Sequence, residues 1–123
     1  MPHSRSRFGT LAEQYAAVYL ASRGYRVLDR NVRTPVGELD LVARRGREIV
    51  FVEVKARKTH AYGTPEESVT PQKQRHLIHA SQAYIAGHRE LRGLPYRIDV
   101  VAITWRGEEE PEVVHIPSAV GEI

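Results

Sequence analysis

The sequence contains no cysteine and no long apolar run. Without cysteine the chain can form neither disulfides nor thiolate sites, and this composition fits a reducing compartment. No segment approaches the roughly 20 apolar residues of a membrane helix, and no apolar run follows the N-terminal residues as in a secretory signal. We therefore expect a cytoplasmic protein with no membrane partner.

Several catalytic motifs are missing as well. The chain has no G-x-S-x-G elbow and no glycine loop that would cradle phosphates, which excludes serine hydrolases and nucleoside triphosphatases. His76 and His79 lie three residues apart, but no third ligand stands at a suitable spacing and neither belongs to an H-E-x-x-H motif. An incidental exposed pair is therefore favoured over a zinc site.

Acidic residues are scarce before the C-terminal segment. Residues 1–107 carry 18 basic and 10 acidic side chains, a net charge of +8, whereas the whole chain has +3. Fifteen of the basic residues are arginines, which bind phosphate through two nitrogens at once. This balance favours a nucleic-acid partner, with a solubilising surface as the alternative. The clusters that we expect to contact nucleic acid contain Arg44, Arg45, Arg57, Lys58, Lys73 and Arg75.

Two apolar segments, 37–43 and 49–56, contain the most informative charges: Glu38, Asp40, Glu53 and Lys55. Charged side chains in buried strands are costly to desolvate unless they are paired or bind a metal. Because residues two apart in a strand share a face, Glu38 and Asp40 lie on one face, and Glu53 and Lys55 also share a face. The opposite faces are formed by Leu39, Leu41 and Ala43 in the first strand and by Val50, Val52 and Val54 in the second.

The connection between these strands predicts how they pair. If Gly46 and Arg47 are the central residues of a type II′ hairpin, paired residue numbers sum to 93. Asp40 then faces Glu53 and Glu38 faces Lys55, with Cβ atoms about 4.5–5.5 Å apart. A turn centred one residue earlier would place Glu38 opposite Glu53 and keep all four charges on one face. A three-residue loop or a bulge would separate the charges of the two strands.

Such a cluster is suited to phosphodiester hydrolysis. Oxygen ligands favour Mg²⁺ or Mn²⁺, and Asp40 and Glu53 could share one cation that keeps waters and room for a phosphate oxygen. Lys55 could orient or deprotonate the attacking water, or neutralise charge that develops on phosphorus. The alternative is a structural ladder of ion pairs from Glu38 to Lys55 and from Asp40 to an arginine.

The segments Gly37–Ala43 and Val50–Arg57 closely resemble those of the YraN family of small bacterial proteins. The resemblance extends from about Gly9 to Thr104 and includes Gly9-x-x-x-Glu13, Thr70-Pro71-x-Lys73 and Arg97-x-Asp99-Val100-Val101-Ala102. That family is similar to the restriction-endonuclease-like PD-(D/E)xK superfamily, which includes Holliday-junction resolvases. The resemblance implies that Asp40, Glu53 and Lys55 are the catalytic acids and lysine and that Glu13 is the superfamily's helical glutamate. One departure is Leu39, which stands where the motif has proline.

The remaining pattern predicts an α/β fold with a restriction-endonuclease-like αβββαβ core, in which helices flank a mixed central sheet. We expect a helix over 7–23, a first strand over 25–32, a loop over 58–69, a helix from Thr70 to Gly87, a buried strand over 96–104 and an edge strand over 113–116. The apolar stripe of the first helix is Phe8, Leu11, Ala12, Tyr15, Val18 and Tyr19, and that of the second is Leu77, Ile78, Ser81, Tyr84 and Ile85. Glu13 lies off this stripe, and a first-turn acid favoured by the helix dipole is its alternative role. Asp99 is expected to be the structural partner of an arginine.

Residues 1–123 are expected to form one nuclease-like domain, with a basic arm over 1–7 and an acidic segment over 106–123. The predicted function is a Mg²⁺- or Mn²⁺-dependent endonuclease that acts on DNA rather than RNA, with branched DNA as a candidate substrate. Asp40 and Glu53 would hold the metal, Lys55 would assist the water, and Glu13 and Glu38 would support them. The alternative is a catalytically inactive nucleic-acid-binding module. A homodimer is a candidate state, because resolvases cut two strands symmetrically.

Overall fold

The computed structural model describes residues 7–58, 68–107 and 109–120, and it begins with an α-helix followed by three strands. Helix α1 (Arg7–Ser22) leads into β1 (Arg26–Thr34), β2 (Gly37–Arg45) and β3 (Glu48–Arg57). Helix α2 (Pro71–Ala86), the short 3-10 helix η2 (Arg89–Leu91), β4 (Tyr96–Thr104) and β5 (Glu112–Ile116) complete the described chain. Most of the predicted 58–69 loop and of the N-terminal arm lies outside the described residues.

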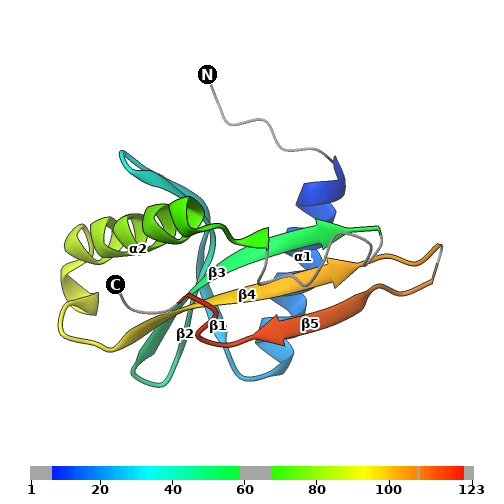
Figure 1. Cartoon of the computed structure of the whole chain (residues 1–123). Helices are drawn as coiled ribbons and strands as arrows, with labels where there is room; N and C mark the ends of the chain where they lie inside the picture. The colour runs from blue at the N-terminus through cyan, green and yellow to red at the C-terminus, as the bar shows by residue number, and fades with distance from the viewer. Residues whose placement is uncertain (1–6, 59–67, 108, 121–123) are drawn as a thin grey trace.

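The five strands form one mixed sheet in the order β1-β2-β3-β4-β5. Strands β3 and β4 are parallel and are joined through α2, whereas the other neighbouring strands are antiparallel. This confirms the predicted αβββαβ order and the βαβ crossover, and the edge strand β5 pairs with β4 as expected (Figure 1). No helix in the described part of the chain is both long and apolar enough to cross a membrane.

The two helices cover opposite faces of the sheet. In Figure 1, α1 passes behind the strands, and α2 lies apart from it beside β1, β2 and β3. The core on the α1 face contains Ala12, Ala16, Leu20, Leu41, Val50, Val52, Val101 and Ile103. The core on the α2 face contains Leu77, Ala80, Tyr84, Val42, Ile49, Phe51, Ile98 and Val100.

The stripe predicted for α1 is wrong in part, because Leu11 is 42% exposed and Val18 is 71% exposed. The face that packs on the sheet is formed by Ala12, Glu13, Ala16, Ala17 and Leu20. Small alanine side chains let a helix approach its neighbour closely, so the alanine-rich face packs in preference to the bulkier one. In α2 the prediction was closer: Leu77, Ser81 and Tyr84 are buried, and Ala80 joins them.

The β2–β3 hairpin has the predicted register. Arg45 pairs with Glu48 and Leu41 pairs with Val52, so partners sum to 93 around the two central residues. Gly46 has φ +61 and is the only one of these two with a positive φ, as a type II′ turn requires. Glycine adopts this conformation without steric cost.

The pairing of β2 with β3 stops at Leu41 and Val52, so the predicted opposition of Glu38 to Lys55 is not part of the ladder. Beyond this point the backbone N–H of Val54 donates to Asp40 Oδ2 at 2.8 Å. A side chain thus accepts the hydrogen bond of a strand amide, and the regular alternation of β2 is broken. The prediction that Leu39 shares a face with Leu41 is therefore wrong: Leu39 packs in the α2 core and Leu41 in the α1 core.

The start of α2 has the predicted cap. Thr70 Oγ1 accepts a hydrogen bond from the N–H of Lys73 at 3.2 Å, and Pro71 is the first helical residue. Thr70→Ala should lower the free energy of unfolding by about 1 kcal/mol, because one N–H of the first turn loses its acceptor. Urea denaturation measures this loss, with the exposed Gln72→Ala variant in the same turn as control. Equal stability of the two variants would contradict the capping role.

Candidate active site

Asp40 and Glu53 form a buried pair of carboxyl groups at the point where β2 leaves β3. Asp40 is 8% exposed and Glu53 is 5% exposed, and a side-chain hydrogen bond joins them. Burial raises the pKa of Glu53, and the neighbouring Asp40 carboxylate raises it further, to about 7. The pair therefore takes up one proton as the pH falls through about 7.

Two lysines converge on the same oxygen of this pair. Lys55 Nζ lies 3.4 Å from Glu53 Oε2, and Lys73 Nζ lies 3.3 Å from it. Their attraction lowers the pKa of Glu53, but by less than burial and Asp40 raise it. Lys55 follows Glu53 by two residues on the α2 face, as predicted, whereas Lys73 comes from the first turn of α2.

The contact between Lys73 and Glu53 was missed in the sequence. We expected Lys73 to contact nucleic acid, because it stands in a basic cluster at a helix start. The predicted βαβ crossover could have indicated this contact, because it packs α2 against the sheet that contains Glu53. The capped N-terminus of α2 then fixes where the Lys73 side chain begins.

Glu13 and Glu38 lie on α1 and β2, whereas Glu53 lies on β3. Glu13 is buried on α1, which covers the opposite face of the sheet. Glu38 pairs with Arg33 of β1 in the ladder, and Arg33 Nε lies 3.7 Å from Glu38 Oε1. The charged groups that shift the pKa of Glu53 are Asp40, Lys73 and Lys55. The supporting roles of Glu13 and Glu38 therefore stay predictions.

The donor set of the pair matches the way Mg²⁺ is held in many proteins. Within residues 7–58, 68–107 and 109–120, no three His, Asp or Glu side chains gather as a metal-binding group. His76 and His79 are both exposed, as expected of an incidental pair. A cation at Asp40 and Glu53 would thus have two carboxylate ligands and would fill its remaining positions with water, the arrangement that Mg²⁺ favours.

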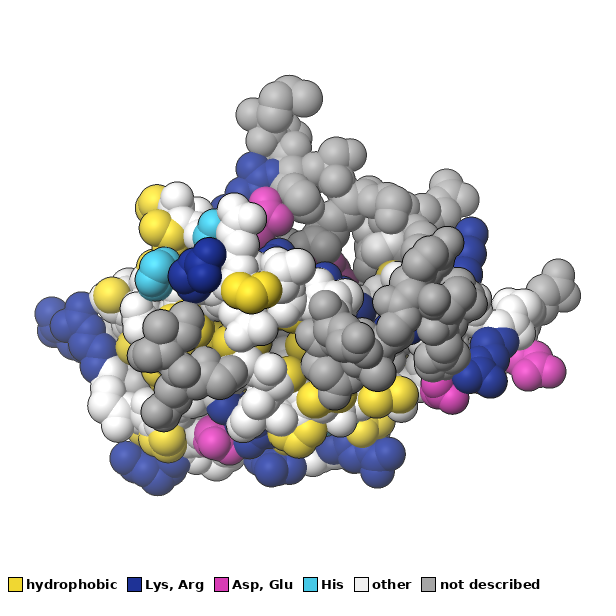
Figure 2. All heavy atoms as spheres, viewed as in Figure 1, with side chains coloured by type: hydrophobic (Ala, Val, Ile, Leu, Met, Phe, Trp, Pro, Cys, Tyr) yellow, Lys and Arg dark blue, Asp and Glu magenta, His cyan; other side chains and the backbone are white. Residues whose placement is uncertain are grey.

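The basic residues predicted to contact nucleic acid lie in different places. Arg44 Nε donates to the carbonyl of Gly46 at 2.8 Å, and the Arg45 guanidinium lies 4.5 Å from the centre of the Tyr25 ring. At about 3.3 Å per residue, this hairpin end is about 16 Å along β3 from Glu53. Lys58 and Arg75 are exposed, and Arg57 is half-buried. In Figure 2, Lys and Arg side chains lie along several edges of the visible face rather than in one patch.

A second charged cluster surrounds Asp99, which is fully buried on the α1 face. Arg97 Nε donates to Asp99 Oδ1 at 3.0 Å, the backbone N–H of Ser118 donates to the same oxygen at 2.8 Å, and His115 Nε2 lies 2.7 Å from Oδ2. Burial alone would raise the pKa of Asp99, but these hydrogen bonds together lower it below its ordinary value. The predicted arginine partner is confirmed.

Arg97 extends this cluster toward α1 and β3. Its Nη2 donates to the hydroxyl of Tyr25 at 2.6 Å, and its Nη1 donates to Glu48. The cluster thus connects β3, β4 and β5 with the residue that precedes β1. Sequence reasoning missed His115 and Ser118, because only the β4–β5 register brings them to Asp99.

Comparisons with known proteins agree with the sequence resemblance. The family model described as "Uncharacterised protein family UPF0102" matches residues 12–103. A UPF0102 protein of Syntrophotalea carbinolica is 48% identical over 119 residues, which cover 97% of this chain and 95% of that protein. A UPF0102 protein of Dehalococcoides mccartyi is 40% identical over 122 residues, which cover 99% of each chain.

A solved structure of SfsA from Pyrococcus furiosus, in complex with Ca²⁺, is similar with a TM-score of 0.45 and 13% identity. The match covers 94% of this chain and 65% of the SfsA chain, so this chain spans slightly less than two thirds of that protein. The family match covers most of the described fold, including both carboxyl residues of the pair, Lys55 and Lys73. The chain belongs to the uncharacterised protein family UPF0102.

Proposed function

We propose that the protein is a divalent-metal-dependent endonuclease that hydrolyses phosphodiester bonds in DNA, with branched or otherwise structured DNA as its candidate substrate. The observation that carries the proposal is the buried Asp40–Glu53 pair with two lysines on Glu53 Oε2. The YraN resemblance supports the same assignment, because it aligns Asp40, Glu53 and Lys55 with the acids and the lysine of the PD-(D/E)xK motif.

The pair is suited to a divalent cation because it carries more negative charge than its surroundings stabilise. A proton relieves that charge at neutral pH, as the raised pKa of Glu53 indicates. Mg²⁺ or Mn²⁺ held by Asp40 and Glu53 would replace the proton and neutralise both carboxylates. When bound, such a cation polarises a phosphate oxygen and lowers the pKa of a water molecule.

The two lysines supply the positive charge that hydrolysis of a phosphodiester requires. Lys55 is 26% exposed and Lys73 is 39% exposed, so both ammonium groups reach the surface while they contact Glu53. Fixed cations at this position stabilise the charge that develops on phosphorus without reorganisation. Lys55, on the same strand as Glu53, would orient the attacking water, and Lys73 would hold a phosphate from the helix side.

A second candidate is a nucleic-acid-binding module without turnover. It is favoured by the same two lysines, because they neutralise part of the charge on Glu53 without a metal. The basic balance of residues 1–107 would supply the affinity, which should fall steeply as the salt concentration rises.

A cleavage assay separates the two candidates. Linear duplex, single-stranded, flapped and four-way-junction DNA are incubated with Mg²⁺, Mn²⁺ or EDTA. We expect a metal-dependent product, reduced at least about 100-fold in Glu53→Ala and Asp40→Asn, because each removes a carboxylate that would hold the metal ion. The matched control is Glu112→Gln, which removes an exposed carboxylate 3.8 Å from Arg106.

Metal binding is measured in parallel by calorimetry with Mn²⁺, so that the ligand role is tested apart from turnover. Undiminished cleavage by the Glu53→Ala protein would contradict the endonuclease proposal. An absence of product on every substrate, together with salt-sensitive binding, would favour the second candidate.

A further inference from the structure

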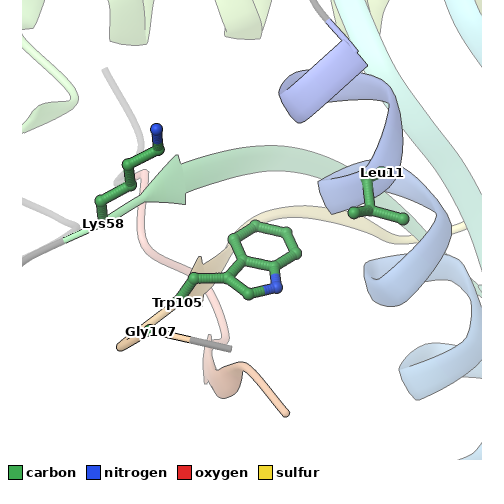
Figure 3. A pocket seen from close by; sticks show the side chains of 4 residues that line it. All are labelled: Leu11, Lys58, Trp105 and Gly107. Atoms are coloured by element: carbon green, nitrogen blue, oxygen red, sulfur yellow. The ribbon is translucent and has the colours of Figure 1, made fainter. Parts of the chain in front are cut away.

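A cavity of about 430 Å³ opens at the ends of the two parallel strands. Its described walls are Leu11 of α1, Lys58 after β3, and Trp105 and Gly107 after β4. The N–H of Trp105 donates to the carbonyl of Arg57 at 2.9 Å, which holds the two strand ends together at this cavity. In Figure 3 the Trp105 ring lies between Lys58 on one side and Leu11 on the other. We call this cavity the Trp105 pocket.

The pocket combines a flat aromatic wall with a cation at its rim. The Trp105 indole is partly exposed and contacts the Tyr15 ring edge-to-face, with centroids 5.6 Å apart. Leu11 is one of few large apolar side chains that the described chain exposes, and it belongs to the outer side of α1 that the sheet does not cover. Lys58 is exposed, and the adjacent Arg57 adds a second positive charge near the strand end.

We propose that the Trp105 pocket binds an unstacked nucleobase of a single-stranded nucleic-acid segment, with the indole against the base and Lys58 at its phosphate. Aromatic stacking beside cations is how proteins hold single strands without reading their sequence. The volume falls in the range of small-ligand pockets. A nucleotide can use both the aromatic ring and the positive charge at the rim.

This inference rests on the proposed function and specifies its substrate class. Lys58 follows Glu53 by five residues, so the pocket rim lies about 16 Å from Glu53 along β3. Trp105 packs on the α1 side of the sheet, whereas Lys55 and Lys73 meet Glu53 on the α2 side. A base held in the pocket therefore belongs to a strand that has left its duplex. The pocket therefore selects DNA with an unpaired strand, such as a flap or an opened junction, over a blunt duplex.

The chain contains a single tryptophan and six tyrosines, so tryptophan fluorescence, excited selectively, reports on this pocket alone. An oligothymidylate of about 12 nucleotides is titrated into the protein in EDTA, so that no cleavage takes place. We expect saturable quenching by the single strand and by a flapped duplex, and little quenching by a blunt duplex of the same length. Equal quenching by blunt duplex and single strand would overturn the inference.

Variants test whether the ring contributes affinity. Trp105→Leu should weaken binding of a labelled single strand about 5- to 150-fold, the range for loss of one stacked base, and Trp105→Phe should restore part of it. The control is Tyr96→Leu, which removes an exposed aromatic at the opposite end of β4 and should leave affinity unchanged. Circular dichroism verifies that each variant is folded.

Single-strand binding measured by anisotropy with unchanged tryptophan fluorescence would overturn the inference, and so would wild-type affinity of the Trp105→Leu protein. Because every measurement is made without metal, stacking can be observed in a protein that cleaves nothing. Failure of the nuclease proposal is thereby distinguished from failure of the pocket proposal.

Discussion

Replacement of Asp99 by alanine is expected to lower the free energy of unfolding by about 3–5 kcal/mol, the cost of removing one partner from a buried ion pair. Asp99 is fully buried and accepts hydrogen bonds from Arg97 and from the backbone N–H of Ser118, and His115 contacts its second oxygen. Without the carboxylate, the Arg97 guanidinium keeps Glu48 and Tyr25 as its partners among the described residues, and the Ser118 amide loses its acceptor.

Urea denaturation at pH 7 measures this loss. The control is Glu112→Ala, which breaks an exposed ion pair with Arg106 and should cost less than about 1 kcal/mol. The acid dependence gives a second test. Because the pKa of Asp99 is lowered on folding, its contribution is present above the ordinary value of 3.8 and is lost as the pH falls through the lower folded value. A loss below 1 kcal/mol in Asp99→Ala would contradict the structural role.

Replacement of Glu53 by glutamine is expected to have the opposite effect and to stabilise the metal-free protein at pH 8. The pKa of Glu53 rises from an ordinary 4.5 to about 7 in the folded protein, and this value already includes the attraction of Lys55 and Lys73. Keeping the group ionised in the fold therefore costs on the order of 3 kcal/mol. Glutamine is uncharged and of similar size, so it removes that cost.

The sign of the pH dependence follows from the same linkage. The folded protein binds the Glu53 proton more tightly than the unfolded chain does, so protonation of Glu53 stabilises the fold. That stabilisation is complete below pH 4.5 and is lost as the pH rises through about 7. In thermal melts with EDTA at pH 5 and pH 8, the Glu53→Gln protein should have a higher melting temperature than the parent only at pH 8. A Glu53→Gln protein less stable than the parent at pH 8 would contradict the expected free-energy cost of ionised Glu53 in the folded protein.

Local signals in the sequence were sufficient for the hairpin and for the start of α2. A glycine between two alternating apolar runs favoured the observed register, because a type II′ turn has glycine at its first central position, although a turn centred one residue earlier was the alternative. Thr70 and Pro71 defined the helix start, because both residues suit that position for separate physical reasons. The shared face of Glu53 and Lys55 followed from the same alternation.

The rest depended on contacts between elements. The periodicity of apolar residues predicted that the bulkier side of α1 packs on the sheet, but the alanine-rich side, which carries Glu13, packs there instead. Alternation failed at Leu39, because a side chain replaces a backbone acceptor one residue later. The approach of Lys73 to Glu53 and of His115 to Asp99 depends on how α2 and β5 are placed against the sheet. These contacts join residues that are far apart in the sequence, so local sequence patterns do not predict them.

Because the Val54 amide donates a hydrogen bond to Asp40, Asp40 has two structural roles. Asp40 completes the backbone hydrogen bonding of β3 and at the same time presents charge to the carboxyl pair. Asparagine at position 40 keeps an acceptor oxygen for the backbone and so fills the first role alone, whereas alanine fills neither role. The hydrogen bonding of the sheet and the charge of the carboxyl pair therefore depend on the same residue.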